Sequence, residues 1–68
     1  MQPLYQQIAS DVREQIRTGA LKSGDKILST RELVERYEVS QMVVRMAMVQ
    51  LKAEGLVVGV PGKGVYVR

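Results

Sequence analysis

The sequence contains neither cysteine nor histidine. Without cysteine the chain has no disulfide framework and no thiolate metal site, which favours a reducing compartment. Without histidine it lacks zinc-finger ligands, a histidine general base and a Ser-His-Asp triad. The acidic residues are scattered and no phosphate-binding loop is present. We therefore expect a protein that is not an enzyme and needs no metal or cofactor.

Aromatic side chains and long apolar runs are also scarce. Phe and Trp are absent and only three tyrosines occur, which argues against an aromatic platform for single-stranded nucleic acid. No apolar run reaches the roughly 18 residues of a membrane span, and the N-terminus lacks a signal-peptide pattern. We expect a cytoplasmic protein without a membrane partner. The net charge of +3 is compatible with binding to a phosphate backbone, although many ordinary domains are as basic.

A stripe of apolar side chains at helical spacing predicts an amphipathic helix over residues 4–17, with Gly19 as its stop. The stripe consists of Leu4, Ile8, Val12 (or Ala9) and Ile16. The connection that follows, residues 20–26, is rich in turn-forming residues. We expect Leu21 and Ile27 to anchor this connection in the core.

Two serines mark the starts of two further helices. Ser29 and Glu32 form a capping box, in which each side chain can bond the backbone N–H of the other, and a short helix follows. After a turn at Glu38-Val39, Ser40 is a candidate N-cap for a helix that runs to about residue 54. One face of this last helix is expected to be core, and consists of Val44, Ala47, Met48 and Leu51.

The last part of the chain carries β-strand patterns. Residues 56–60 and 65–67 are rich in valine, and Pro61-Gly62-Lys63-Gly64 joins them, which predicts a β-hairpin with a glycine-rich tip. Three helices followed by a two-stranded hairpin describe a winged helix-turn-helix, an α+β fold formed by residues 1–68. The order alone is equally compatible with a small α+β domain that has no nucleic-acid role.

Several motifs in fixed order resemble the DNA-binding domain of the GntR-type bacterial transcription regulators, over essentially the whole chain. They are Pro3-Leu4-Tyr5-Gln6-Gln7-Ile8, Gly19-Ala20-Leu21-Lys22-Ser23-Gly24-Asp25-Lys26, Ser29-Thr30-Arg31-Glu32-Leu33, Tyr37-Glu38-Val39-Ser40, Val44-Arg45, Leu51-Lys52-Ala53-Glu54-Gly55-Leu56-Val57 and the wing Gly62-Lys63-Gly64-Val65-Tyr66-Val67. Residues 35–47 resemble the HutC branch of the family. The resemblance implies a sequence-specific regulator, expected to be a repressor. It also implies a C-terminal domain, absent from residues 1–68, that binds a small-molecule effector and often dimerises.

The resemblance and the residue chemistry together nominate a set of residues that contact DNA. Arg45 lies about 100° from Val44 on a helical wheel and would point into a major groove, where Arg to guanine O6 and N7 is the commonest specific contact. Lys63 lies between two glycines that permit a close backbone approach, and would meet phosphate or enter a minor groove. The full set is Arg31, Ser40, Gln41, Met42, Val43, Arg45, Gly62, Lys63 and Gly64.

Each of these candidates also has a reading without DNA. Arg31 could pair with Glu35 one turn on, and Arg45 with a nearby acid. Ser40 could serve only as a helix cap, although helix N-termini also favour phosphate. The glycine-rich tip could be a plain tight turn with Lys63 for solubility. The resemblance favours the DNA contact in each case.

Several positions depart from the family's usual residues. The family usually carries Arg where this chain has Gln41, often Thr where it has Val43, and commonly a polar or charged residue where it has Met46. It prefers Gly where this chain has Glu38, and a non-glycine residue is costly there if the turn needs a left-handed backbone. The family also has Pro where this chain has Leu28.

The outer arc of the 40–54 helix is therefore apolar, and two interpretations of it stay open. The arc consists of Met42, Val43, Met46 and Val49. It could contact thymine methyl groups in an A·T-rich site, with Gln41 or Gln50 pairing with adenine. It could instead bind protein, which would make the chain a winged-helix interaction module. We favour binding to double-stranded DNA, with a homodimer of the full-length protein on a pseudo-palindromic operator.

Overall fold

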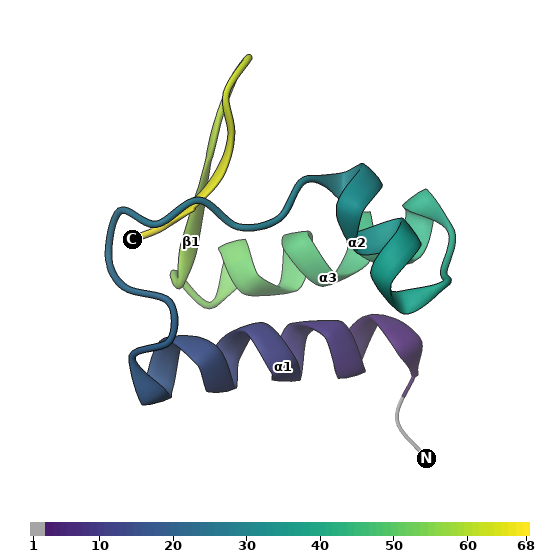
Figure 1. Ribbon diagram of the computed structural model, residues 1–68, viewed down its shortest axis with the longest axis horizontal. Coiled ribbons are helices and arrows are strands. Elements are labelled where there is room, and N and C mark those ends of the chain that lie inside the picture. Colours follow the sequence, from purple (N-terminus) through teal and green to yellow (C-terminus); the bar gives the residue numbers. More distant parts are fainter. Residues whose placement is uncertain (1–2) are drawn as a thin grey trace.

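The computed structural model describes residues 3–68, which form three helices and one antiparallel hairpin (Figure 1). The elements are α1 (Leu4–Thr18), α2 (Thr30–Tyr37), α3 (Gln41–Ala53), β1 (Val57–Val60) and β2 (Gly64–Val67). This order confirms the predicted winged helix-turn-helix. Residues 1 and 2, with which the predicted domain begins, lie outside the described residues. Within the described part, every helix is too short or too polar to cross a membrane.

The helix ends follow the capping signals in the sequence. Ser29 Oγ accepts from the backbone N–H of Glu32 at 3.2 Å, and the Glu32 carboxylate accepts from the Ser29 N–H at 3.1 Å, so the capping box is confirmed. Ser40 Oγ accepts from the Val43 N–H at 3.3 Å and caps α3. Gly19 takes the left-handed conformation that ends α1. Local side-chain bonds therefore fix where α2 and α3 begin.

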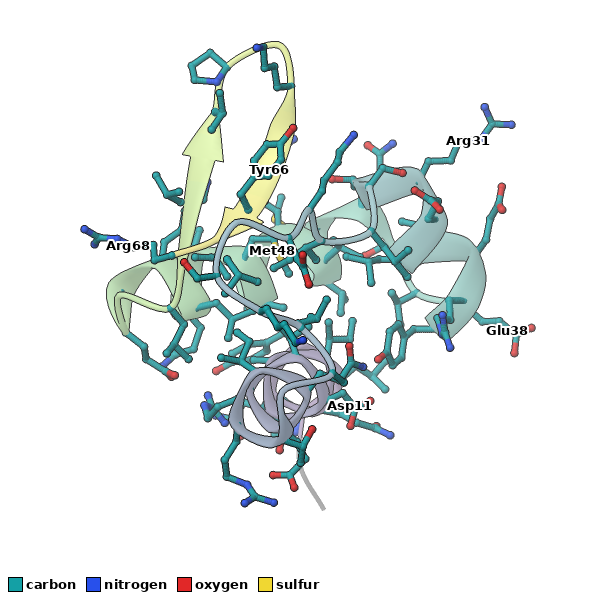
Figure 2. All side chains as sticks on the ribbon, turned by 60° about the vertical axis from the view of Figure 1, so that its left-hand side comes forward. Asp11, Arg31, Glu38, Met48, Tyr66 and Arg68 are labelled. Carbon is teal, nitrogen blue, oxygen red and sulfur yellow. The ribbon has the colours of Figure 1, made fainter. Side chains whose placement is uncertain are left out.

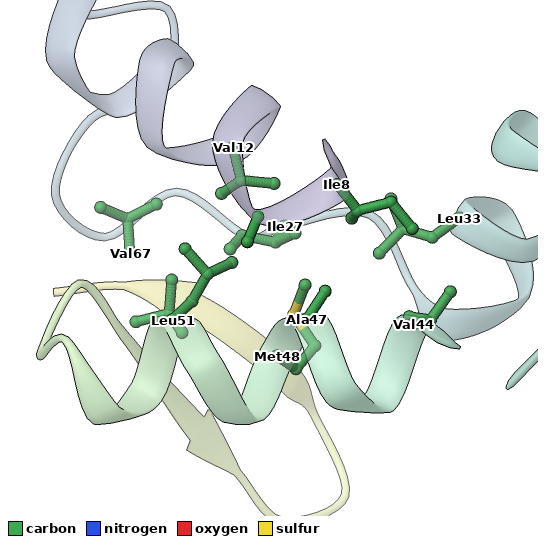
Figure 3. Packing of buried hydrophobic residues seen from close by; sticks show 11 residues of the cluster. Ile8, Val12, Ile27, Leu33, Val44, Ala47, Met48, Leu51 and Val67 are labelled. Carbon is green, nitrogen blue, oxygen red and sulfur yellow. The ribbon is translucent and has the colours of Figure 1, made fainter. Parts of the chain in front are cut away.

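α3 runs through the centre of the molecule and carries much of the core (Figure 3). Its buried side chains face α1, α2 and the base of the hairpin. The buried set is Ile8, Ala9, Val12, Ile27, Leu33, Val44, Ala47, Met48, Leu51, Val57 and Val67. The four core residues predicted on α3 are all among them, and Ile27 anchors the connection after α1 as predicted. Because α3 is held on several sides, its outer face is presented to solvent in a fixed orientation.

The prediction that Leu4 belongs to the buried stripe of α1 is wrong, because its side chain is 55% exposed. Each step of four residues turns a side chain by about 40° on a helix of 3.6 residues per turn. Along the series from Ile16 back to Ile8 this drift carries Leu4 to the edge of the stripe. Tyr5, one residue later, packs against the core in its place.

The hairpin is extended by the chain segment that precedes α2. β1 pairs with β2 so that Val57 lies opposite Val67 and Val60 opposite Gly64. On the other edge of β2, the Ile27 N–H donates to the Val65 carbonyl and the Val67 N–H to the Asp25 carbonyl, both at 2.8 Å. These bonds form an isolated antiparallel bridge between Lys26 and Tyr66 beside the two predicted strands. They also join the hairpin to the connection between α1 and α2.

Polar contacts tie α1 to the other helices. The Arg13 guanidinium donates two hydrogen bonds, at 2.9 and 2.8 Å, to the carboxylate of Glu54 at the end of α3. These bonds, and a further one from Gln50, hold the pKa of Glu54 below its usual value. The Tyr37 hydroxyl donates to Asp11 at 2.9 Å, and its partial burial raises the pKa of Tyr37. Because the ion pair is exposed, it orients the helices and adds little stability.

Replacing Glu38 by glycine should stabilise the protein. Glu38 ends α2 with φ 54° and ψ 49°, which is the left-handed region of backbone conformation. The family prefers glycine at this position, and a residue with a side chain is costly there. A side chain disfavours this backbone by about 1–2 kcal/mol, part of which is offset by the greater freedom of glycine in the unfolded chain. We therefore expect Glu38→Gly to raise the free energy of unfolding by about 1 kcal/mol.

Urea denaturation followed by circular dichroism measures this change. Glu35→Gly is the matched control, because Glu35 lies inside α2 with an exposed side chain. Glycine in a helix interior costs about 1 kcal/mol, so the control should lose stability. A loss of stability in both variants would contradict the assignment of strain to residue 38.

Candidate nucleic-acid interface

Among the described residues, the polar and charged side chains lie on the surface of the molecule and do not line an enclosed site. Every buried side chain among residues 3–68 is apolar. No group of three or more metal-ligating side chains comes together in the same part of the chain. A ligand must therefore meet exposed side chains on helices and on the hairpin.

Arg45 lies on the exposed side of α3, one residue after the fully buried Val44. Within residues 3–68 its guanidinium forms no ion pair and no hydrogen bond, so the reading of Arg45 as a partner for a nearby acid finds no support. All five N–H donors of the guanidinium remain available to a ligand. Ser40 and Gln41, at the start of the same helix, are also exposed.

Arg31 forms the ion pair with Glu35 that was expected as the alternative to a DNA contact. Its Nε lies 3.5 Å from Glu35 Oε1, one turn along α2, and the two side chains are 89% and 68% exposed. Exposed pairs of this spacing contribute about 0.3–0.5 kcal/mol, so a phosphate can displace Glu35 at little cost. Figure 2 shows Arg31 extending into solvent, far from Asp11 of α1.

The hairpin tip is a tight turn built by glycine. Gly62 and Gly64 have positive φ angles of 75° and 132°, and the Lys63 N–H donates to the Val60 carbonyl at 3.0 Å. This geometry carries Lys63 to the outer end of the hairpin, where its side chain is exposed. The tip projects well beyond the helices (Figure 1), so it can reach a surface that α3 also touches.

Most of the apolar arc of α3 is exposed, as predicted. Met42 is 59%, Met46 43% and Val49 61% exposed. Together with Arg45 and Gln50 they line a shallow groove, which Tyr5 of α1 closes on one side. From the sequence Tyr5 only flanks the apolar stripe of α1, since helical spacing alone does not show which side chains of α1 reach α3.

The placement of Val43 on this outer arc needs correction. Its side chain is partly buried and packs against the core cluster. On a helical wheel Val43 lies about 100° from Val44, on the side opposite Arg45. Val43 therefore presents only part of its surface to a ligand.

Two further lysines lie beside the hairpin and were not singled out from the sequence. Lys52 of α3 approaches Gly59, and Lys26 from the connection after α1 approaches Gly64. The two residues of each pair come together only because the hairpin packs against the rest of the domain. The signal available beforehand was Gly59 inside the expected first strand, because glycine within a strand often marks a close approach.

The sequence matches known regulators along nearly its whole length. A model of the bacterial regulatory proteins of the gntR family matches residues 4–67. The mannosyl-D-glycerate transport/metabolism system repressor MngR of Escherichia coli (strain K12) is 41% identical over 66 residues, which cover 97% of this chain and 28% of that protein. The HTH-type transcriptional repressor NagR of Bacillus subtilis (strain 168) is 37% identical over 65 residues, 96% of this chain and 27% of that protein. The chain thus spans little more than a quarter of each relative.

Solved structures show the same fold. The DNA-binding domain of AraR in complex with operator ORX1 has a TM-score of 0.97 and 31% identity, and the match covers 100% of this chain and 82% of that one. A GntR family transcriptional regulator from Listeria monocytogenes has a TM-score of 0.91 and 35% identity, over 97% of this chain and 58% of that one. The chain therefore belongs to the gntR family of bacterial regulatory proteins, as a DNA-binding domain of the winged helix-turn-helix type.

Proposed function

We propose that the chain reads a specific double-stranded operator on behalf of a transcriptional repressor. The observation that carries this proposal is the exposed Arg45, which forms no ion pair among residues 3–68 and lies on a helix whose opposite face packs into the core. A rigid helix with a free guanidinium is suited to reading a major groove. The AraR DNA-binding domain, whose fold matches this whole chain and which was solved in complex with an operator, supports operator binding.

The exposed side chains divide into reading and positioning groups. Arg45 reads guanine, and Gln41 pairs with adenine or another base edge. Met42 and the exposed part of Val43 contact thymine methyl groups. The positioning groups meet sugar and phosphate, and comprise Arg31, the N-terminus of α3 at Ser40, and the wing tip Gly62, Lys63 and Gly64.

The complete protein is proposed to act as a homodimer on a pseudo-palindromic operator, because two symmetric copies place two reading helices on two half-sites. Its effector domain would lie beyond residue 68, would bind a small molecule and would resemble the HutC branch. Repression is supported by the two relatives named above, which are both repressors. Such a regulator works in the cytoplasm, where the chromosome is.

Selection from a random pool of double-stranded DNA tests the proposal. The chain would be fused to a dimerising tag, and bound sequences would be recovered at low and at physiological salt. We expect an enriched palindrome that survives physiological salt, because base contacts add to the electrostatic attraction. Binding without enrichment, lost as salt rises, would contradict sequence reading and leave only nonspecific attraction.

A second candidate function is a protein-interaction module, which the exposed groove beside Tyr5 favours. Its apolar lining, the exposed parts of Met42, Met46 and Val49, could pack against another protein. In that case the chain should associate as its concentration rises, and Met46→Glu should abolish association by placing a charge in the contact. Analytical ultracentrifugation measures this, with Gln15→Glu on α1 as the control of equal charge. Association that persists in Met46→Glu would exclude the groove as the interface.

A further inference from the structure

Two lysines are packed against the glycines of the hairpin. The ammonium nitrogen of Lys52 lies 3.1 Å from where a Cβ at Gly59 would be, and Cε of Lys26 lies 2.8 Å from the corresponding point at Gly64. A side chain at either glycine would meet the lysine stem, and at Gly64 the separation is below that of real Cβ contacts. The glycines thus leave room for two cationic side chains along the wing.

The two lysines lie on opposite faces of the hairpin. Gly59 pairs with Val65, and Gly64 pairs with Val60. Residues that pair directly share a face, and successive residues alternate between faces, so Gly59 and Gly64 face opposite ways. Gly59 shares the inner face with the buried Val57, next to α3 and its Lys52.

Lys26 belongs to the outer face. It is bridged to Tyr66, which lies two residues from Gly64 and therefore on the same face of β2. Its side chain runs diagonally across the hairpin towards the tip. With Lys63 at the turn, the hairpin carries one cation on each face and one at its end; we call Lys26, Lys52 and Lys63 the wing lysines.

The positive charge of the wing lysines is not neutralised within the described structure. None of them forms an ion pair among residues 3–68, and all are exposed. The pKa of Glu32 is lowered mainly by its hydrogen bonds with Ser29 in the capping box and only to a lesser extent by the charge of Lys26. An ammonium on a flexible stem with no internal partner is suited to a phosphate oxygen.

We propose that Lys26 and Lys52 contact phosphates on the two strands that border the minor groove entered by the wing. This inference rests on the proposed DNA-reading function and adds two residues to its positioning groups. A minor groove is about 6 Å wide. When a hairpin enters this groove, the sugar-phosphate backbone of one DNA strand therefore lies against each of its two faces. The lysine on the inner face meets one strand, and the lysine on the outer face meets the other.

The dependence of DNA affinity on salt tests this arrangement. Each phosphate contact contributes about −0.9 to the slope of log K against log salt concentration. For one chain bound to a half-site duplex, we expect Lys26→Gln and Lys52→Gln each to reduce the magnitude of that slope by about 0.9, and the double variant by about 1.8. The preference for the selected motif over a scrambled duplex should not change, because these contacts carry no sequence information.

Lys22→Gln is the matched control. Lys22 is exposed and follows α1. Figure 1 shows that the segment directly after α1 lies away from the hairpin tip. The substitution Lys22→Gln removes the same charge. Its slope should equal that of the unsubstituted chain. If all single variants change the slope equally, the effect is one of net charge and the proposed contacts are overturned.

The same measurements distinguish a failure of the proposed phosphate contacts from a failure of the proposed DNA-reading function. If the unsubstituted chain selects a motif but Lys26→Gln and Lys52→Gln keep its full slope, the phosphate contacts are wrong and the DNA-reading function stands. If the unsubstituted chain selects no motif at any salt concentration, both are overturned. Circular dichroism spectra of the variants should match that of the unsubstituted chain, since both lysines are exposed.

Discussion

Replacing Arg45 by alanine should weaken the preference for operator DNA at the base pair that Arg45 reads and leave the fold intact. A bidentate contact from arginine to guanine contributes about 1–3 kcal/mol of discrimination against the wrong base, about 5-fold to 150-fold in affinity. In a dimer two copies of the contact are lost. Discrimination should relax at one base pair of each half-site and persist at the others, because the remaining reading residues are unchanged.

Competition binding of the selected motif against a motif with that base pair changed measures the loss. Arg17→Ala is the control, because Arg17 is an exposed arginine in the last turn of α1 and is paired with Glu14 of the same helix. It should change affinity slightly through net charge and leave discrimination alone. Unchanged discrimination in Arg45→Ala would contradict the role of Arg45.

Replacing Leu51 by alanine should cost more stability than most changes in this chain. Leu51 is fully buried, and Figure 3 shows it between Val12 of α1 and Val67 of β2. Truncation of a buried leucine costs about 2–5 kcal/mol, since it loses apolar burial and leaves a cavity. A core of this size supplies roughly 3–5 kcal/mol of net stability. We expect Leu51→Ala to be largely unfolded at 25 °C.

Urea or thermal unfolding followed by circular dichroism measures this effect. Val49→Ala, two residues away on the same helix, is the control because Val49 is 61% exposed. Its free energy of unfolding should change by less than about 0.5 kcal/mol. A cooperative unfolding transition in Leu51→Ala at the position of the unsubstituted chain would contradict the central place of Leu51 in the core.

The parts of the fold that depend on neighbours in sequence could be predicted. The capping box at Ser29 and Glu32 and the cap at Ser40 need only residues three apart, so the starts of α2 and α3 followed directly from the sequence. The core face of α3 followed from helical periodicity, with Leu51 and Val44 both fully buried. The order of the expected elements predicted the topology, and the family motifs then favoured a nucleic-acid role, which the topology alone left open.

The parts that depend on docking between elements could not be predicted in the same way. Periodicity gives the stripe of α1 but not its edge, so Leu4 was included in the stripe although its side chain is exposed, and Tyr5, which flanks the stripe, packs against the core. Val43 turned inward for a similar reason, because the width of the buried face depends on how α1 and α2 pack on α3. The approach of Lys52 to Gly59 exists only once the hairpin has folded against α3.

The DNA contacts of the candidate residues stay a prediction. Their positions on the folded chain show which elements a DNA duplex would have to meet. Arg31, Arg45 and Lys63 come from α2, α3 and the wing, and all are exposed. Arg45 has no acidic partner in the part of the chain that the structure describes, whereas Arg31 must exchange Glu35 for phosphate. A DNA duplex that meets all three elements at once would bury little of α1 beyond its first turn.

Amide chemical-shift mapping during titration with the selected duplex tests this account most directly. The account predicts that the largest changes lie at residues 30–31, 40–46 and 62–64, and that residues 11–18 of α1 change little. Changes concentrated on residues 11–18, with α3 and the hairpin tip unaffected, would contradict the claim that α3 and the wing together read DNA.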